Sequence, residues 1–130
     1  PIAEELSLKI IETSYKLSKC YSIAEFAHGP YALVERGTTV ILLAPDGKFK
    51  EDFAAMAAKL KKDGAKVIVI TDVKQIYNCL SDDGILLPNK KDSQVFLFIL
   101  AAQVYAAYMS KACGNNPDKP RGLNKVTLTI

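Results

Sequence analysis

The sequence predicts an α/β fold, a three-layer α/β/α sandwich built around a mostly parallel sheet. Two observations lead to this prediction. Short, continuously apolar stretches rich in Val, Ile and Leu alternate with segments of helical periodicity, and apolar strands of this kind are covered on both faces in parallel sheets. The length of 130 residues is also enough for one domain, residues 1–130, with a substantial core.

The chain opens with a predicted amphipathic helix over residues 2–18. Its apolar positions recur at helical spacing and are Ile2, Leu6, Ile10, Thr13 and Leu17. Pro1 suits a first helical turn, where its missing N–H is no loss. Residues 19–30 are expected to be irregular or briefly helical, up to the break at Gly29-Pro30.

Three strands and two helices are predicted next. The runs "TTVILLA" (38–44), "AKVIVITD" (65–72) and "GILLP" (84–88) are the strand candidates, and each is bounded by turn residues. The alanine-rich stretch 50–64 predicts a helix that ends at Gly64, and residues 73–80 predict a shorter one.

A strongly apolar helix is predicted from about Ser93 to Cys113. Its core, "VFLFILAAQVYAAYM" (95–109), is interrupted by Gln103 and is too short to span a bilayer, so we expect a buried helix. The tail begins as a loop and ends in the alternating "KVTLTI".

The composition argues against several classes of function. The net charge of +3 arises from 17 basic and 14 acidic residues that are mixed along the chain, so we expect no nucleic-acid partner and no membrane partner. No signal peptide is evident, which favours a cytoplasmic protein. The three cysteines form no C-x-x-C pair and there is a single histidine, so we expect no metal, no disulfide and no cofactor.

Glu12 is the leading candidate for a general base. A carboxylate with a pKa near neutrality can move a proton between adjacent carbon atoms. Glu5, Lys9 and Glu12 recur at i, i+4 and i+7 and form a charged stripe. Lys9 could orient an anionic substrate, or simply pair with Glu12, and Glu12 could equally be a solvated glutamate.

His28 and Lys125 are the other candidates for chemistry. Histidine titrates near neutrality and can move hydroxyl protons, although a histidine beside Gly29-Pro30 could also be an ordinary loop residue. Lys125 is either a solvated tail lysine or an amine that meets a carbonyl or phosphate. Asp118 and Arg121 are predicted to be structural, as the N-cap of a tight turn and its ion-pair partner.

A phosphate-binding loop is missing from the expected places. In parallel α/β folds phosphates bind at the carboxyl ends of strands, against a helix N-terminus. The turns that follow the first two strands, "APDGK" and "TDVK", each carry an acid that would repel phosphate. We expect the anchor for any phosphate ester to lie on another piece of protein.

Three ordered segments resemble the sugar isomerase (SIS) family. "PIAEELSLKIIETSY", "AEFAHGP" and "DKPRGLNKVT" are similar to the C-terminal SIS domain of glucosamine-6-phosphate synthases (glutamine–fructose-6-phosphate transaminases) and of related deaminases and deglycases. The resemblance covers the whole chain and implies the flavodoxin-like α/β/α sandwich predicted above.

The resemblance also implies roles for individual residues. Glu12 matches the proton-transferring base, His28 of "HGP" the ring-opening residue, and Lys125 of "PRGLNK" the lysine that meets the sugar carbonyl. Glu5 and Lys9 match charged positions in supporting roles. We assign them, together with Asn124, to substrate binding.

The implied protein is an enzyme that acts on fructose 6-phosphate or glucosamine 6-phosphate by ring opening and C1–C2 proton transfer. Family members carry two such domains in tandem, and the phosphate site lies in the first. We therefore expect a missing upstream SIS domain, an inactive isolated chain and a homodimer. The alternative is a non-catalytic module for sugar-phosphate binding or assembly.

Overall fold

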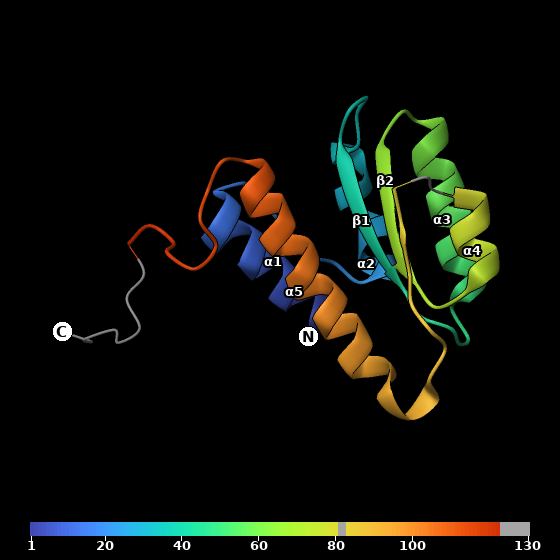
Figure 1. Ribbon diagram of the computed structural model, residues 1–130. Coiled ribbons are helices and arrows are strands. Elements are labelled where there is room, and N and C mark those ends of the chain that lie inside the picture. The colour runs from blue at the N-terminus through green and yellow to red at the C-terminus, as the bar shows by residue number, and fades with distance from the viewer. Residues whose placement is uncertain (81–82, 123–130) are drawn as a thin grey trace. The chain divides into compact units, whose positions relative to one another are not determined.

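The computed structural model describes residues 1–80 and 83–122 (Figure 1). The chain packs as two compact units, one formed by residues 1–20 with the chain from Ile99 onward and the other by residues 21–98. The helices and strands are α1 (Ile2–Ser14), α2 (Ile23–His28), β1 (Thr39–Ala44), α3 (Lys50–Lys62), β2 (Lys66–Thr71), α4 (Lys74–Leu80), β3 (Ile85–Leu86) and α5 (Gln94–Ala112), with 3₁₀ turns η1 (Pro30–Leu33) and η2 (Lys91–Ser93).

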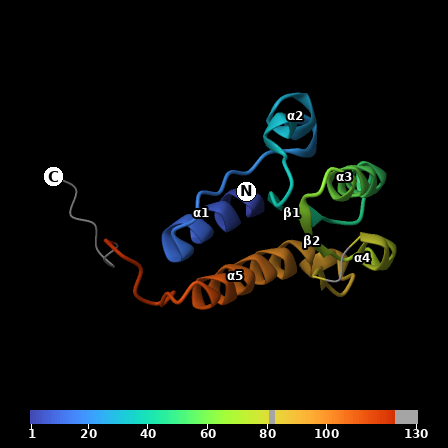
Figure 2. The same ribbon diagram turned by 90° about the horizontal axis from the view of Figure 1, so that it is seen from above.

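The unit of residues 21–98 contains a parallel three-stranded sheet in the order β1-β2-β3. The register of β1 on β2 runs from Thr39 opposite Lys66 to Ala44 opposite Thr71. Helices α3 and α4 follow β1 and β2 in the chain and lie on the same side of these strands (Figure 2). This arrangement confirms the predicted α/β class and its parallel sheet.

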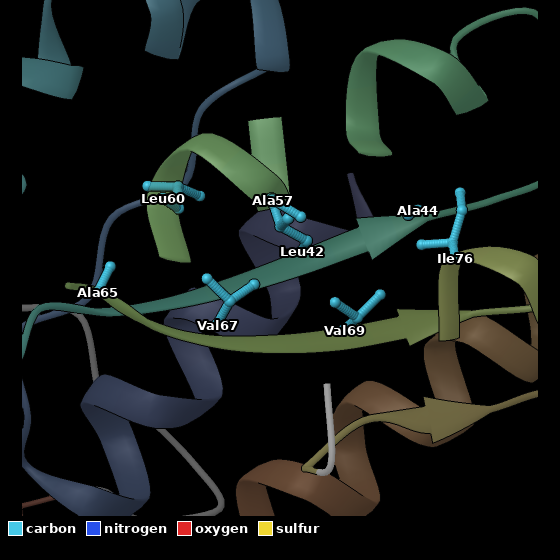
Figure 3. Packing of buried hydrophobic residues seen from close by; sticks show 8 residues of the cluster. All are labelled: Leu42, Ala44, Ala57, Leu60, Ala65, Val67, Val69 and Ile76. Carbon is cyan, nitrogen blue, oxygen red and sulfur yellow. The ribbon is translucent and has the colours of Figure 1, made fainter. Parts of the chain in front are cut away.

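The core of this unit lies between the sheet and helices α3 and α4 (Figure 3). Alternate residues of a strand point to one face of a sheet. The cluster therefore takes its members from every second position of each strand, and they are Leu42 and Ala44 of β1, Val67 and Val69 of β2, Ala57 and Leu60 of α3, Ile76 of α4, and Ala65. In β2 the intervening residues Ile68 and Ile70 are buried as well, as its unbroken apolar sequence predicts.

In the other unit, α1 lies beside the C-terminal part of α5 (Figures 1 and 2). Leu6, Ile10 and Thr13 are buried along α1, which confirms the predicted stripe up to that point. The Ser110 hydroxyl of α5 donates a hydrogen bond to the Thr13 carbonyl oxygen at 2.8 Å. The prediction was wrong for Leu17, which is fully exposed, because α1 ends at Ser14 and helical spacing no longer applies beyond it.

The prediction of a buried apolar helix was wrong for several large residues of α5. Small residues such as Ala102 and Ala106 are buried, whereas Phe96, Leu100 and Tyr108 are more than half exposed. By length and composition alone, residues Lys91–Ala112 form the one helix among the described residues that could cross a membrane, and 28% of its most apolar window is buried. Core helices of soluble proteins pass the same test.

Candidate active site

The candidate site lies on the charged face of α1, which the sequence pattern predicts. Residues three and four positions apart meet on a helix surface, and here Glu5, Lys9 and Glu12 come together. The Lys9 ammonium lies 2.7 Å from Glu12 Oε2, to which it donates a hydrogen bond, and 4.0 Å from Glu5 Oε1. The Glu12 side chain is one quarter exposed, so the predicted pair is formed while Glu12 remains open to solvent.

The Glu5 and Glu12 carboxylates flank the Lys9 ammonium and favour its charged form. The hydrogen bond to Glu12 raises the pKa of Lys9, and the charges of Glu12 and Glu5 act in the same direction, against the effect of partial burial. Lys9 therefore stays protonated at neutral pH. The alternative in which Lys9 simply pairs with Glu12 is what the structure shows, whereas its contact with an anionic substrate stays a prediction.

A pocket of about 240 Å³ opens beside this charged face. Its lining residues come from α1, α5 and the segment after α5, and they are Lys9, Thr13, Gln103, Ala106, Ala107 and Pro117. The Thr13 hydroxyl is already used, because it donates to the Lys9 carbonyl oxygen at 2.7 Å. Sequence reasoning missed Thr13, Gln103 and Pro117 as pocket residues. The signal for Gln103 was present, since it is the polar residue that interrupts the apolar stretch 95–109.

The segment after α5 has a turn that differs from the prediction. The Asn116 side chain caps it by accepting the backbone N–H of Asp118 at 2.9 Å, and Lys119 N–H donates to the Asn116 carbonyl oxygen. Asp118 was therefore wrongly predicted as the cap. Arg121 contacts Tyr15, the residue that follows α1, in place of the predicted ion pair. Because asparagine and aspartate both form such turns, the sequence does not separate the two.

His28 belongs to the other unit. It is the last residue of α2 and is exposed, not a residue of an irregular loop. Ser22 and Glu25 form a capping box at the start of this short helix. Within the described chain His28 has no hydrogen-bond or ion-pair partner, so its imidazole is open to solvent and to other molecules. Asn124 and Lys125 lie outside the described residues.

The carboxyl ends of β1 and β2 are occupied by an aspartate network. Asp72 is 6% exposed and accepts hydrogen bonds from the Asp46 backbone N–H at 2.7 Å and from the Gln94 side chain. The Thr71 hydroxyl donates to the Ala44 carbonyl oxygen at 2.6 Å and links the two strand ends. A buried, hydrogen-bonded carboxylate would repel a phosphate at this edge, as the sequence suggested.

Comparison with known proteins assigns the chain to a family. The SIS domain model matches residues 1–109, which include Glu5, Lys9, Glu12 and His28. The chain therefore belongs to the SIS domain family. Asn124 and Lys125 lie beyond the matched residues.

The similar curated proteins carry the name glutamine–fructose-6-phosphate aminotransferase. The chain is 39% identical over 125 residues to a probable glutamine–fructose-6-phosphate aminotransferase of Acanthamoeba polyphaga mimivirus, covering 96% of this chain and 20% of that protein. It is 34% identical over 126 residues to the glutamine–fructose-6-phosphate aminotransferase of Pyrococcus horikoshii, with 96% and 21% covered. The chain thus spans about one fifth of the length of the curated relatives it matches.

Solved structures agree with the architecture. The glucosamine-6-phosphate deaminase of Thermotoga maritima superposes with a TM-score of 0.72 at 30% identity, over 95% of this chain and 35% of that one. The C-terminal domain of the glucosamine-fructose-6-phosphate aminotransferase of Francisella tularensis reaches a TM-score of 0.76 at 24% identity, over 92% and 34%. The second likeness supports the fold, and the first also supports the family.

Proposed function

We propose that this SIS domain is part of an enzyme that interconverts the ketose and aldose forms of a sugar phosphate by C1–C2 proton transfer, acting on fructose 6-phosphate with addition of ammonia or on glucosamine 6-phosphate with its release. The observation that carries the proposal is the Glu5–Lys9–Glu12 face beside the pocket, with its 2.7 Å Lys9–Glu12 contact. The names of the similar proteins support the substrate class, because they are aminotransferases and a deaminase of these sugars.

Each proposed residue has one step in the reaction. His28 would move the hydroxyl proton that opens the sugar ring. Glu12 would remove a proton from one of the two adjacent carbons, C1 or C2, and return it to the other. Lys9 would hold the Glu12 carboxylate in place through its 2.7 Å hydrogen bond, which is charge-assisted. Lys125 would meet the open-chain carbonyl as an amine, and Glu5 and Asn124 would support binding.

Turnover is proposed to need more of the protein than this chain. Positioning of the reacting carbons draws on remote binding energy, and a phosphate group normally provides it through several convergent donors. The strand ends at which phosphates usually bind carry Asp46 and Asp72 here. The donors would then come from another part of the longer protein, or from a second copy in a homodimer.

Solvent deuterium exchange at the sugar carbons tests the role of Glu12. In the longer protein that contains this chain, Glu12→Gln should lower exchange by roughly 10²- to 10⁴-fold, the usual contribution of general acid–base catalysis, with unchanged circular dichroism. Glu4→Gln is the matched control, because Glu4 is an exposed acid of the same helix. The isolated chain should show no exchange.

Two results would contradict the proposal. Full exchange in the Glu12→Gln protein would overturn the assignment of the base. Binding of the sugar phosphate by the unmodified longer protein without any exchange would favour the non-catalytic binding module.

A further inference from the structure

Tyr15 ends helix α1 in an uncommon backbone conformation. Its φ of 55° and ψ of 34° place it in the left-handed region, and it is the one non-glycine residue with positive φ among residues 1–80 and 83–122. Bulky residues are rare in this region. Glycine or asparagine would be the usual choice at such a helix end, so the side chain of Tyr15 must contribute something that those residues lack.

That contribution is a double contact with the tail. The Tyr15 hydroxyl oxygen accepts a hydrogen bond from the Arg121 backbone N–H at 2.8 Å. The Arg121 guanidinium lies over the same ring, with its central carbon 4.3 Å from the ring centroid. One side chain therefore binds both the main chain and the cation of a residue 106 positions away.

A second contact places the same tail along α1. Pro117 lines the pocket together with Lys9 and Thr13 of α1. Between Pro117 and Arg121 the chain makes the turn capped by Asn116. The tail therefore passes the pocket first and reaches the end of α1 at Tyr15, which is one helical turn beyond Glu12 in the sequence.

We infer that Tyr15 is a positioning residue that fastens the C-terminal tail beside Glu12. The inference rests on the function proposed above, in which Glu12 and Lys125 act on the same sugar. Lys125 follows Arg121 by four residues, a length of chain that spans at most about 14 Å when fully extended. Fixing Arg121 at Tyr15 shortens the chain over which a lysine four residues later can range, and a shorter tether raises the effective concentration of the group that it carries.

Tryptic cleavage after Arg121 tests the fastening without any need for activity. Cleavage at a protected site follows the population of its open form. In the longer protein, Tyr15→Leu removes both contacts and should speed cleavage of the Arg121–Gly122 bond by about tenfold or more, the change expected for loss of one good contact. Tyr15→Phe keeps the ring contact and loses the hydrogen bond, so its cleavage rate should lie between those of the unmodified and Tyr15→Leu proteins.

Tyr108→Leu is the control, because Tyr108 is an exposed tyrosine of α5. Lys119 precedes Pro120, so it adds no competing cut. Equal cleavage in the Tyr15→Leu and unmodified proteins would overturn the inference.

A kinetic arm separates positioning from general structural support. Tyr15→Leu should lower kcat for the sugar phosphate and leave KM unchanged, and it should have no further effect on kcat in a Lys125→Ala background. An undiminished additional loss in that background would show that Tyr15 does not act through the tail lysine, and would overturn its positioning role. A protein without measurable turnover contradicts the proposed function alone, since the cleavage assay still decides whether Tyr15 holds the tail.

Discussion

At the scale of single residues, Tyr31 ties the segment after His28 to helix α3. Its hydroxyl donates a hydrogen bond to Asp63 Oδ2 at 2.5 Å, and the Lys59 ammonium lies 3.7 Å from the centroid of its ring. Phe26 of α2 packs edge-on against the same ring. The short α2 helix that presents His28 is thereby held to the rest of its unit by side chains from two elements.

The Tyr31–Asp63 hydrogen bond makes the stability of the folded protein depend on pH in the alkaline range. The hydrogen bond to Asp63 raises the pKa of Tyr31 to about 12 from an ordinary value of 10. A group whose pKa is raised in the folded state stabilises that state below its unfolded pKa, and the benefit disappears as pH rises through the folded value. The stability advantage of the natural protein over Tyr31→Phe should therefore be constant below about pH 10 and decline towards pH 12.

Urea unfolding at a series of pH values measures this difference. Asp63→Asn offers a matched variant, because it keeps the tyrosine and removes the charge that holds its proton, and it should weaken the same dependence. A difference between the natural protein and Tyr31→Phe that stays flat up to pH 12 would contradict the prediction.

At the scale of elements, the entry into β3 requires a glycine. A Cβ at Gly84 would lie 2.7 Å from the Val69 carbonyl oxygen and 3.2 Å from the Tyr77 ring. The backbone oxygen belongs to a central strand and has little freedom to move. The close approach of Gly84 therefore allows β3 to pair with β2.

Gly84→Ala should destabilise the protein by about 1–3 kcal/mol, the usual cost of overpacking. Gly84→Val, with more atoms in the same space, should cost more. Thermal or urea unfolding monitored by circular dichroism measures both variants. Equal stability of the natural protein and the alanine variant would show that β3 tolerates a displacement.

The strands were predictable because each is a local apolar run between turn residues, and the Lys9–Glu12 pair because helical spacing alone brings the two side chains together. The end of α1 was not predictable, because no glycine or proline marks Tyr15. The residue that contacts its ring, Arg121, lies far along the chain. The pocket residues Gln103 and Pro117 escaped for the same reason, because they meet α1 only after folding. Hydrophobicity also fails to show which side of α5 is covered within the chain.

At the scale of the whole molecule, α5 carries an exposed apolar stripe. Its members recur every four residues and so share one side of the helix. They are Phe96, Leu100, Val104 and Tyr108, with exposures between 43% and 73%. A row of large apolar side chains in water favours association, either with a second copy or with further parts of a longer protein.

We expect the isolated chain to form dimers through this stripe. A double variant in which both Leu100 and Val104 are replaced by glutamine loses the apolar contact area. Its molecular mass from light scattering should therefore shift towards that of the monomer. Lys111→Gln, at an exposed polar position of the same helix, should leave the mass unchanged. A monodisperse monomer of the natural chain at high concentration would contradict the expectation.

The division of the chain into two units also bears on the order in which it folds. Residues 21–98 form one uninterrupted unit that contains every described strand, so its contacts need only neighbouring stretches of sequence. The other unit joins the two ends of the chain, and the Ser110–Thr13 hydrogen bond closes a loop of 97 residues. Contacts between distant residues form slowly, and chains are synthesised from the N-terminus. Helix α1 is therefore synthesised before α5 yet waits for it, and the face that carries Glu12 is among the last parts of the described chain to be completed.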